Sequence, residues 1–173
     1  MKEQADNHCF KKLPVCFDFL RLAISQNISE LPQWVWCNGY DNNNTENDNI
    51  MIQLMRFILT DFCANCSRPE SSLTNERTPY VEYVIPIFKY FSATTKLMSF
   101  LWCEKGLVSN KLLAVCMPDY ATKKLLDGIG TTIKDSLERV LIESSGEVDD
   151  KHTIEDTIKL IECGAKCLKE EMN

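Results

Sequence analysis

Histidine and the common catalytic motifs are nearly absent from this sequence. The 173 residues include only two histidines, His8 and His152, and both stand in polar surroundings. No G-x-S-x-G, H-E-x-x-H, P-loop or EF-hand motif is present. The stretch Gly128-Ile-Gly130 is a lone G-x-G that follows no expected strand, so it predicts no phosphate cradle. These absences exclude the enzyme classes that such motifs mark.

Basic residues form no run, and they are outnumbered by acidic ones. The chain has 19 Lys and Arg against 25 Asp and Glu, which gives a formal net charge of -6. Proteins that bind nucleic acid directly usually carry a basic face, and anionic membrane surfaces attract basic segments. The balance therefore disfavours both kinds of partner.

Long apolar runs are also lacking. No stretch approaches the roughly 18 residues that a membrane span needs, because polar residues or Pro86 interrupt every candidate. The N-terminal stretch MKEQADNHCF is polar, whereas a secretory signal needs an apolar core. We therefore expect an intracellular protein of the cytoplasm or nucleus, neither secreted nor membrane-bound.

Cysteine, in contrast, is abundant, with nine residues. In a reducing compartment these are free thiols, and buried ones behave as small apolar side chains. Cys63 and Cys66 have the C-x-x-C spacing of a zinc half-site, but no second pair stands at a fixed distance. The favoured interpretation is therefore no cofactor. Zinc bound within the chain, zinc shared with a partner and a redox pair are the alternatives.

Apolar residues recur at helical spacing along most of the chain. This predicts helices at 13–25, at 49–64 and in the last segment, 153–172, and a helix kinked at Pro86 that ends near Gly106. Residues 109–118 and 119–146 are also read as helices. The fold class predicted is all-α, a single compact irregular bundle of six to eight helices over residues 1–173. Polar stretches near 41–48 and 67–78 are predicted to be flexible loops.

The helical stripes also predict which side chains form the core. They are Phe17, Leu20, Leu54, Met55, Ile58, Phe62, Phe88, Phe91, Met98, Leu101, Leu137, Val140, Ile158 and Ile161.

Two groups of apolar residues are candidate partner-binding sites. Trp34 and Trp36 are read first as a core lid under a loop, with an aromatic anchor for a partner as the alternative. The helix at 153–172 carries the most regular stripe in the chain, which steps by four and three residues. Core packing is the favoured role of this stripe, and a homodimer or partner seam is the alternative. Its members are Ile154, Ile158, Ile161, Ala165 and Leu168.

These observations favour a non-catalytic function. We expect a protein-protein interaction domain, for adaptor docking or dimerisation, in a larger intracellular assembly. One alternative is an enzyme with dispersed catalytic residues, such as a cysteine-dependent one. The other is a helical regulator that binds an amphipathic peptide in a groove.

Overall fold

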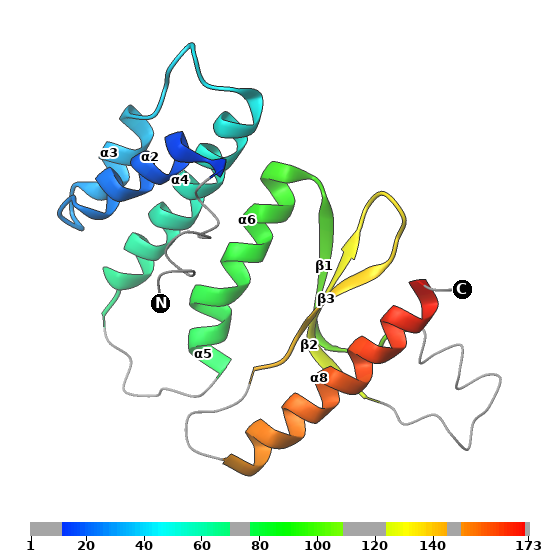
Figure 1. Cartoon of the computed structure of the whole chain (residues 1–173). Helices are drawn as coiled ribbons and strands as arrows, with labels where there is room; N and C mark the ends of the chain where they lie inside the picture. The colour runs from blue at the N-terminus through cyan, green and yellow to red at the C-terminus, as the bar shows by residue number, and fades with distance from the viewer. Residues whose placement is uncertain (1–11, 70–76, 109–123, 145–149, 172–173) are drawn as a thin grey trace, which may run out of the picture. The chain divides into compact units, whose positions relative to one another are not determined.

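The computed structural model describes residues 12–69, 77–108, 124–144 and 150–171 (Figure 1). The chain divides into two compact units, Met1–Ser72 and Leu73–Asn173, and each is described by itself. The single domain expected over 1–173 stays a prediction. In the described residues, no helix is long and apolar enough to cross a membrane.

The described residues of the first unit form three helices, α2 (Pro14–Ile24), α3 (Leu31–Cys37) and α4 (Glu46–Cys66). A proline stands in the first turn of both α2 and α3, where its missing N–H is harmless. Helix α4 begins with a capping box: the Thr45 hydroxyl accepts from the Asp48 amide, and the Asp48 carboxylate accepts from the Thr45 amide. The predicted helices at 13–25 and 49–64 are therefore confirmed, although α4 begins inside the range expected to be loop.

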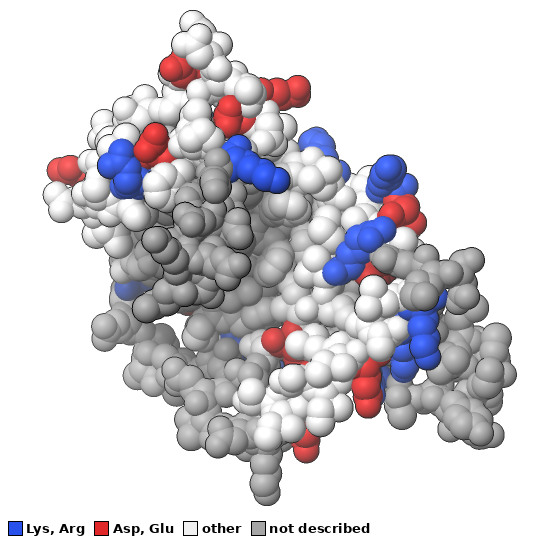
Figure 2. Space-filling view, in the orientation of Figure 1, with Lys and Arg blue, Asp and Glu red and all other residues white. Residues whose placement is uncertain are grey.

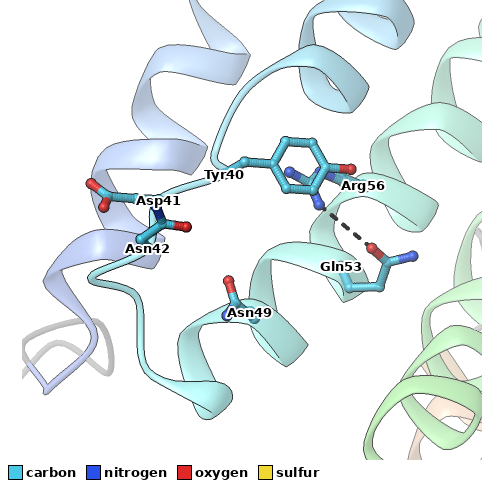
Figure 3. Close-up of a pocket in the computed structure, with 6 residues that line it drawn as sticks. All are labelled: Tyr40, Asp41, Asn42, Asn49, Gln53 and Arg56. Atoms are coloured by element: carbon cyan, nitrogen blue, oxygen red, sulfur yellow. Dashed lines mark hydrogen bonds between the residues drawn. The ribbon is translucent and has the colours of Figure 1, made fainter.

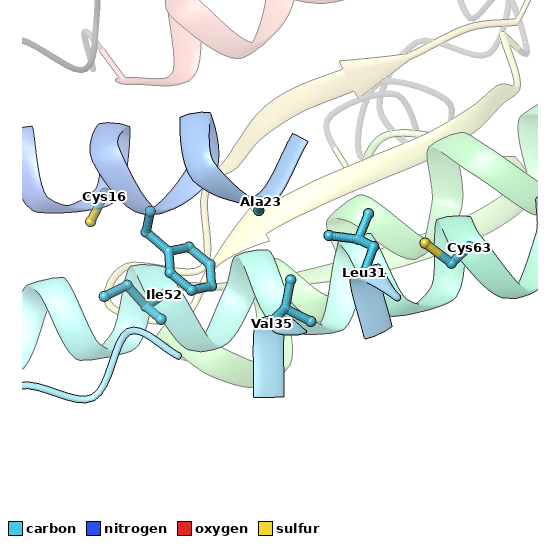
Figure 4. Close-up of a cluster of buried hydrophobic side chains, with 7 residues drawn as sticks. Cys16, Ala23, Leu31, Val35, Ile52 and Cys63 are labelled. Atoms are coloured by element: carbon cyan, nitrogen blue, oxygen red, sulfur yellow. The ribbon is translucent and has the colours of Figure 1, made fainter. Parts of the chain in front are cut away.

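The core of this unit lies where the three helices meet (Figure 4). Helix α2 contributes Cys16, Phe19 and Ala23 rather than the predicted Phe17, which is exposed. The predicted Phe62 of α4 is exposed as well. The buried set comprises Cys16, Phe19, Ala23, Leu31, Val35, Ile52 and Cys63.

The described residues of the second unit begin with a helical segment made of α5 (Arg77–Pro79), the π-helix η2 (Tyr80–Val84) and α6 (Ile85–Thr95). Pro86 cannot donate a helical hydrogen bond, and the chain is wound more loosely before it: the Ile85 amide donates to the Tyr80 carbonyl, five residues back. The predicted irregularity at Pro86 is thus present. The helix ends at Thr95, followed by Lys96 in the left-handed conformation with φ 55°, so it stops well before Gly106.

A three-stranded antiparallel sheet follows, with the order β1-β2-β3. The strands are β1 (Met98–Lys105), β2 (Leu126–Thr132) and β3 (Glu138–Ile142). Gly128 and Gly130 of β2 lie opposite Trp102 and Phe100 of β1. Those two rings are stacked, with centroids 5.6 Å apart, and Phe88 of α6 packs against both. Helix α6 therefore covers one face of the sheet.

Helix α8 (Asp150–Glu171) covers the other face (Figure 1). Its Cys163 is fully buried with Leu107, Leu126 and Ile129, and Leu141 packs against this cluster. The predicted helix at 153–172 is confirmed, apart from an earlier start.

The sheet overturns the predicted all-α bundle of six to eight helices. Residues 98–105 and much of 119–146, both read as helix, form strands instead. The expected short helix at 109–118 lies outside the described residues. Three predicted core residues of this unit, Leu101, Ile158 and Ile161, are exposed.

Candidate functional site

Helix α8 has apolar side chains on two faces. The inner face packs on the sheet with Leu160, Cys163 and Cys167. The other face, called here the outer face of α8, consists of Ile154, Ile158, Ile161, Ala165 and Leu168, all of them exposed. The stripe expected to form core therefore points away from it.

The exposure of the outer face is large. Ile154, Ile158, Ile161 and Leu168 are 60%, 49%, 66% and 61% exposed. Single exposed apolar residues are ordinary, whereas a contiguous row of branched side chains is typical of an interaction surface. The row steps by four and three residues, which is the spacing of a coiled-coil seam.

The inner face is fixed to the sheet by a close fit and by one ion pair. The small Cys163 side chain lets the helix backbone approach Leu126 and Ile129. The Lys159 Nζ donates to Glu143 Oε1 at 2.6 Å, and the Glu143 side chain is only 10% exposed. Since a rotation of α8 would break this pair and expose the inner face, the outer face is held outward.

A groove of about 260 Å³ lies beside the outer face, between β3 and α8. Leu168 lines it together with Leu141 and Cys167, and Gly164 forms part of its wall. A Cβ added at Gly164 would meet no described atom within 4 Å. The middle of α8 is thus open to the approach of another backbone, because Gly164 and Ala165 present almost no side chain there.

Charged groups border the outer face. Glu162 forms an ion pair with Lys124, which precedes β2. On the face of the molecule shown in Figure 2, Lys and Arg are interspersed with Asp and Glu instead of being gathered by sign. Beside the row, α8 carries Glu155, Glu162 and Lys169. The rim of the outer face therefore has charges of both signs, which agrees with the polar rim of a protein-protein interface.

The two candidate tryptophans lie on α3, and both have neighbours within the first unit. Trp34 is half-buried against Phe19, with ring centroids 5.5 Å apart. Trp36 is 36% exposed, packs edge-on against Phe57 and donates from Nε1 to Thr60 Oγ1 at 2.9 Å. A partner role for either residue stays a prediction.

Cys63 and Cys66 occupy the last turn of α4. Cys63 is buried in the helical core, and Cys66 is exposed. Burial raises the pKa of the Cys63 thiol, with a smaller contribution from Cys66, which favours the neutral form that binds metal poorly. Within the described ranges, no group of three or more His, Cys, Asp or Glu side chains could hold a metal ion. His8 and Cys9 lie outside these ranges.

A polar pocket of about 560 Å³, which the sequence did not indicate, lies around Arg56 in the first unit (Figure 3). Arg56 is only 3% exposed, and its guanidinium lies 3.9 Å from the centre of the Tyr40 ring. Its Nε donates to the Val35 carbonyl at 2.7 Å, and its Nη2 donates to the Asn38 carbonyl. These contacts place the positive charge at the C-terminus of α3, where the helix dipole favours it. Arg56 therefore has a structural role, and its donors toward α3 are already in use.

Two buried oxygens in the second unit have no hydrogen-bond partner among the described residues, Tyr80 Oη and Glu143 Oε2. Burial raises the pKa of Tyr80 to about 12, with added repulsion from Asp127, Cys103 and Glu143. Burial also raises the pKa of Glu143, against the attraction of Lys159. A bridging water would satisfy such groups at little cost.

Comparison of the chain with protein-family models, curated proteins and solved structures found no match.

Proposed function

We propose that this chain is a non-catalytic protein-interaction domain that binds its partner through the outer face of α8. The observation that supports this proposal is the row of exposed apolar side chains at Ile154, Ile158, Ile161 and Leu168. Moving one such side chain from water into a fully buried site is favourable by about 1.5–3 kcal/mol of free energy. A partner that covers the row gains part of this free energy at each position.

The shape of the surface favours a helical partner. An amphipathic helix anchors itself at positions i, i+3, i+4 and i+7 in an apolar groove. The outer face offers a complementary row, and the groove at Gly164 and Leu168 adds a recess beside it. A regulator that binds an amphipathic peptide is the second candidate, because the same recess would hold one face of that peptide.

A cysteine-dependent enzyme receives less support. Burial raises the pKa of the thiols of Cys16, Cys63 and Cys163, and the thiolate is the reactive form. These three residues are therefore better suited to packing than to nucleophilic attack. The seven described cysteines are free, which supports a place in a reducing compartment, within an assembly of the cytoplasm or nucleus.

The test is affinity purification with mass spectrometry on three versions of the full chain. Ile161→Asp places a charge in the middle of the outer face. Ile133→Asp is the matched control, because Ile133 belongs to the same unit, lies outside α8 and is 58% exposed. We expect one stoichiometric partner, which can be the chain itself detected with a second tag. It binds the unaltered chain and Ile133→Asp but is lost with Ile161→Asp. The same set of proteins with all three versions would refute the proposal.

A further inference from the structure

The outer face of α8 has the arrangement of a seam that pairs with itself. The positions repeat every seven residues in two series, one with Ile154, Ile161 and Leu168 and the other with Ile158 and Ala165. These are the d and a positions of a heptad. The inner residue Cys163 falls at position f, on the opposite side of the helix, which agrees with its complete burial.

The sizes of the side chains favour an antiparallel orientation of the two α8 helices. In a parallel pair each residue faces its own copy, so the small Ala165 would face Ala165 and leave a gap beside Gly164. In an antiparallel pair centred near residue 163, a positions face d positions. Ile161 then faces Ala165 of the other copy, and Ile158 faces Leu168. The large Ile161 thus fills the space beside the small Ala165. The notch at Gly164, the place on α8 where no side chain projects, lies close to the two-fold axis.

The charges beside the seam also favour the antiparallel orientation. Glu155, Glu162 and Lys169 occupy the e positions, and in antiparallel pairs e positions face one another. Glu155 therefore lies opposite Lys169 of the second copy, twice by symmetry. Glu162 lies opposite its own copy near the axis, and the ion pair with Lys124 offsets that repulsion. A parallel pair brings Glu155 and Lys169 into no such contact.

From these observations we infer that the partner of α8 is the α8 of a second copy of this chain, paired antiparallel. The inference rests on the proposed function, since it names the partner of the same face. The four large side chains, Ile154, Ile158, Ile161 and Leu168, bury about 80 Å² each and Ala165 buries less. The pair therefore buries roughly 700 Å², which is the size of a weak interface. The dimer forms in the micromolar range and dissociates on dilution.

Sedimentation equilibrium of the full chain, from about 1 to 500 μM, measures the association in the range that the interface size implies. We expect a monomer–dimer equilibrium for the unaltered chain and for Ile133→Asp. Ile161→Asp weakens the dimer about 100-fold or more, because two charges would enter the apolar seam. Gly164→Leu fills the notch on an open side of the helix, so the monomer stays folded while the dimer weakens.

Charge reversal tests the orientation. Glu155→Lys and Lys169→Glu each weaken the dimer, and the double variant restores it, because the two signs are exchanged across the seam. Failure of the double variant to restore association would overturn the antiparallel arrangement.

A chain that stays monomeric at 500 μM, or a dimer that tolerates Ile161→Asp and Gly164→Leu, would overturn the second copy as the partner. The proposed function fails by a different result, namely an unchanged partner set for Ile161→Asp in the affinity experiment.

Discussion

Replacing Gly130 by alanine adds one methyl group at the most crowded point of the sheet. The new Cβ would lie 2.5 Å from Cε1 of Phe100 and 2.9 Å from Cβ of Val140, whereas carbon atoms pack best at about 3.5–4.0 Å. The strands or the Phe100 ring must move by about 1 Å. Such overpacking costs about 1–3 kcal/mol, and the reduced entropy of the unfolded chain returns about 0.4–1 kcal/mol. We expect a net loss of about 1–2 kcal/mol.

Urea denaturation followed by the fluorescence of Trp102 measures this loss, in a background where Trp34 and Trp36 are replaced by phenylalanine. Gly164→Ala is the matched control, because its Cβ meets no described atom within 4 Å. The control should stabilise α8 by about 1 kcal/mol through helix propensity alone. A neutral or stabilising effect of Gly130→Ala would show that Phe100 does not pack closely over this glycine.

Three further predictions concern single side chains. Thr45→Ala removes the capping box of α4 and should lower the unfolding free energy of the first unit by about 1 kcal/mol; an unchanged value would contradict the cap. Arg56→Met leaves two carbonyls at the end of α3 without their buried donor, so denaturation of the first unit should show a loss of about 3 kcal/mol. A loss below 1 kcal/mol would show that the guanidinium is not required there. Burial raises the pKa of Glu143, so the folded state binds this proton more tightly than the unfolded state does. The contribution of Glu143 to the unfolding free energy therefore falls as pH rises above about 4, the ordinary Glu pKa. The unfolding free energy of the unaltered chain, relative to Glu143→Gln, should decrease over that range, and a rise would contradict the argument.

The helices of the first unit could be predicted because their local signals and their packing agree. Pro14 favours a helix start at α2, and the apolar run of α4 is too long for a strand. The face of α2 was harder to assign, since Phe17 and Phe19 are equally apolar. Which of them is buried depends on where α3 and α4 lie, and this information is not local.

The sheet was not predicted because helical spacings run through its strands, and they masked β-branched residues such as Ile129, Thr131 and Val140. In β1, Met98, Phe100 and Trp102 do alternate inward, but Leu101 completes a helical pattern through the same stretch. In β2, Gly128 and Gly130 looked like defects in a helix. They are the residues that leave room for Trp102 and Phe100, so the reason for them lies on another strand.

The candidate site was predicted in its residues but not in its orientation. The longer stripe of α8 was expected to be core, whereas the face with Cys163 is the one that packs on the sheet. Cys163 is buried there, and Leu160 and Cys167 are partly buried. Hydrophobicity alone cannot rank two apolar faces of one helix. The burial of Cys163 and the contact between Lys159 and Glu143 decide between them, and both depend on the sheet.

In the proposed function, α8 holds the second unit together with one face and leaves the other face free for binding. The most direct measurement compares the unfolding free energies of Ile161→Asp and Cys163→Asp at submicromolar concentration, below the range in which the dimer forms. Ile161 is 66% exposed and Cys163 is 0% exposed. The unfolding free energy of Ile161→Asp should stay within about 0.5 kcal/mol of that of the unaltered chain. The unfolding free energy of Cys163→Asp should fall by about 3–5 kcal/mol, because an unpaired charge is buried. A loss of several kcal/mol for Ile161→Asp, with Cys163→Asp tolerated, would show that the outer face is core.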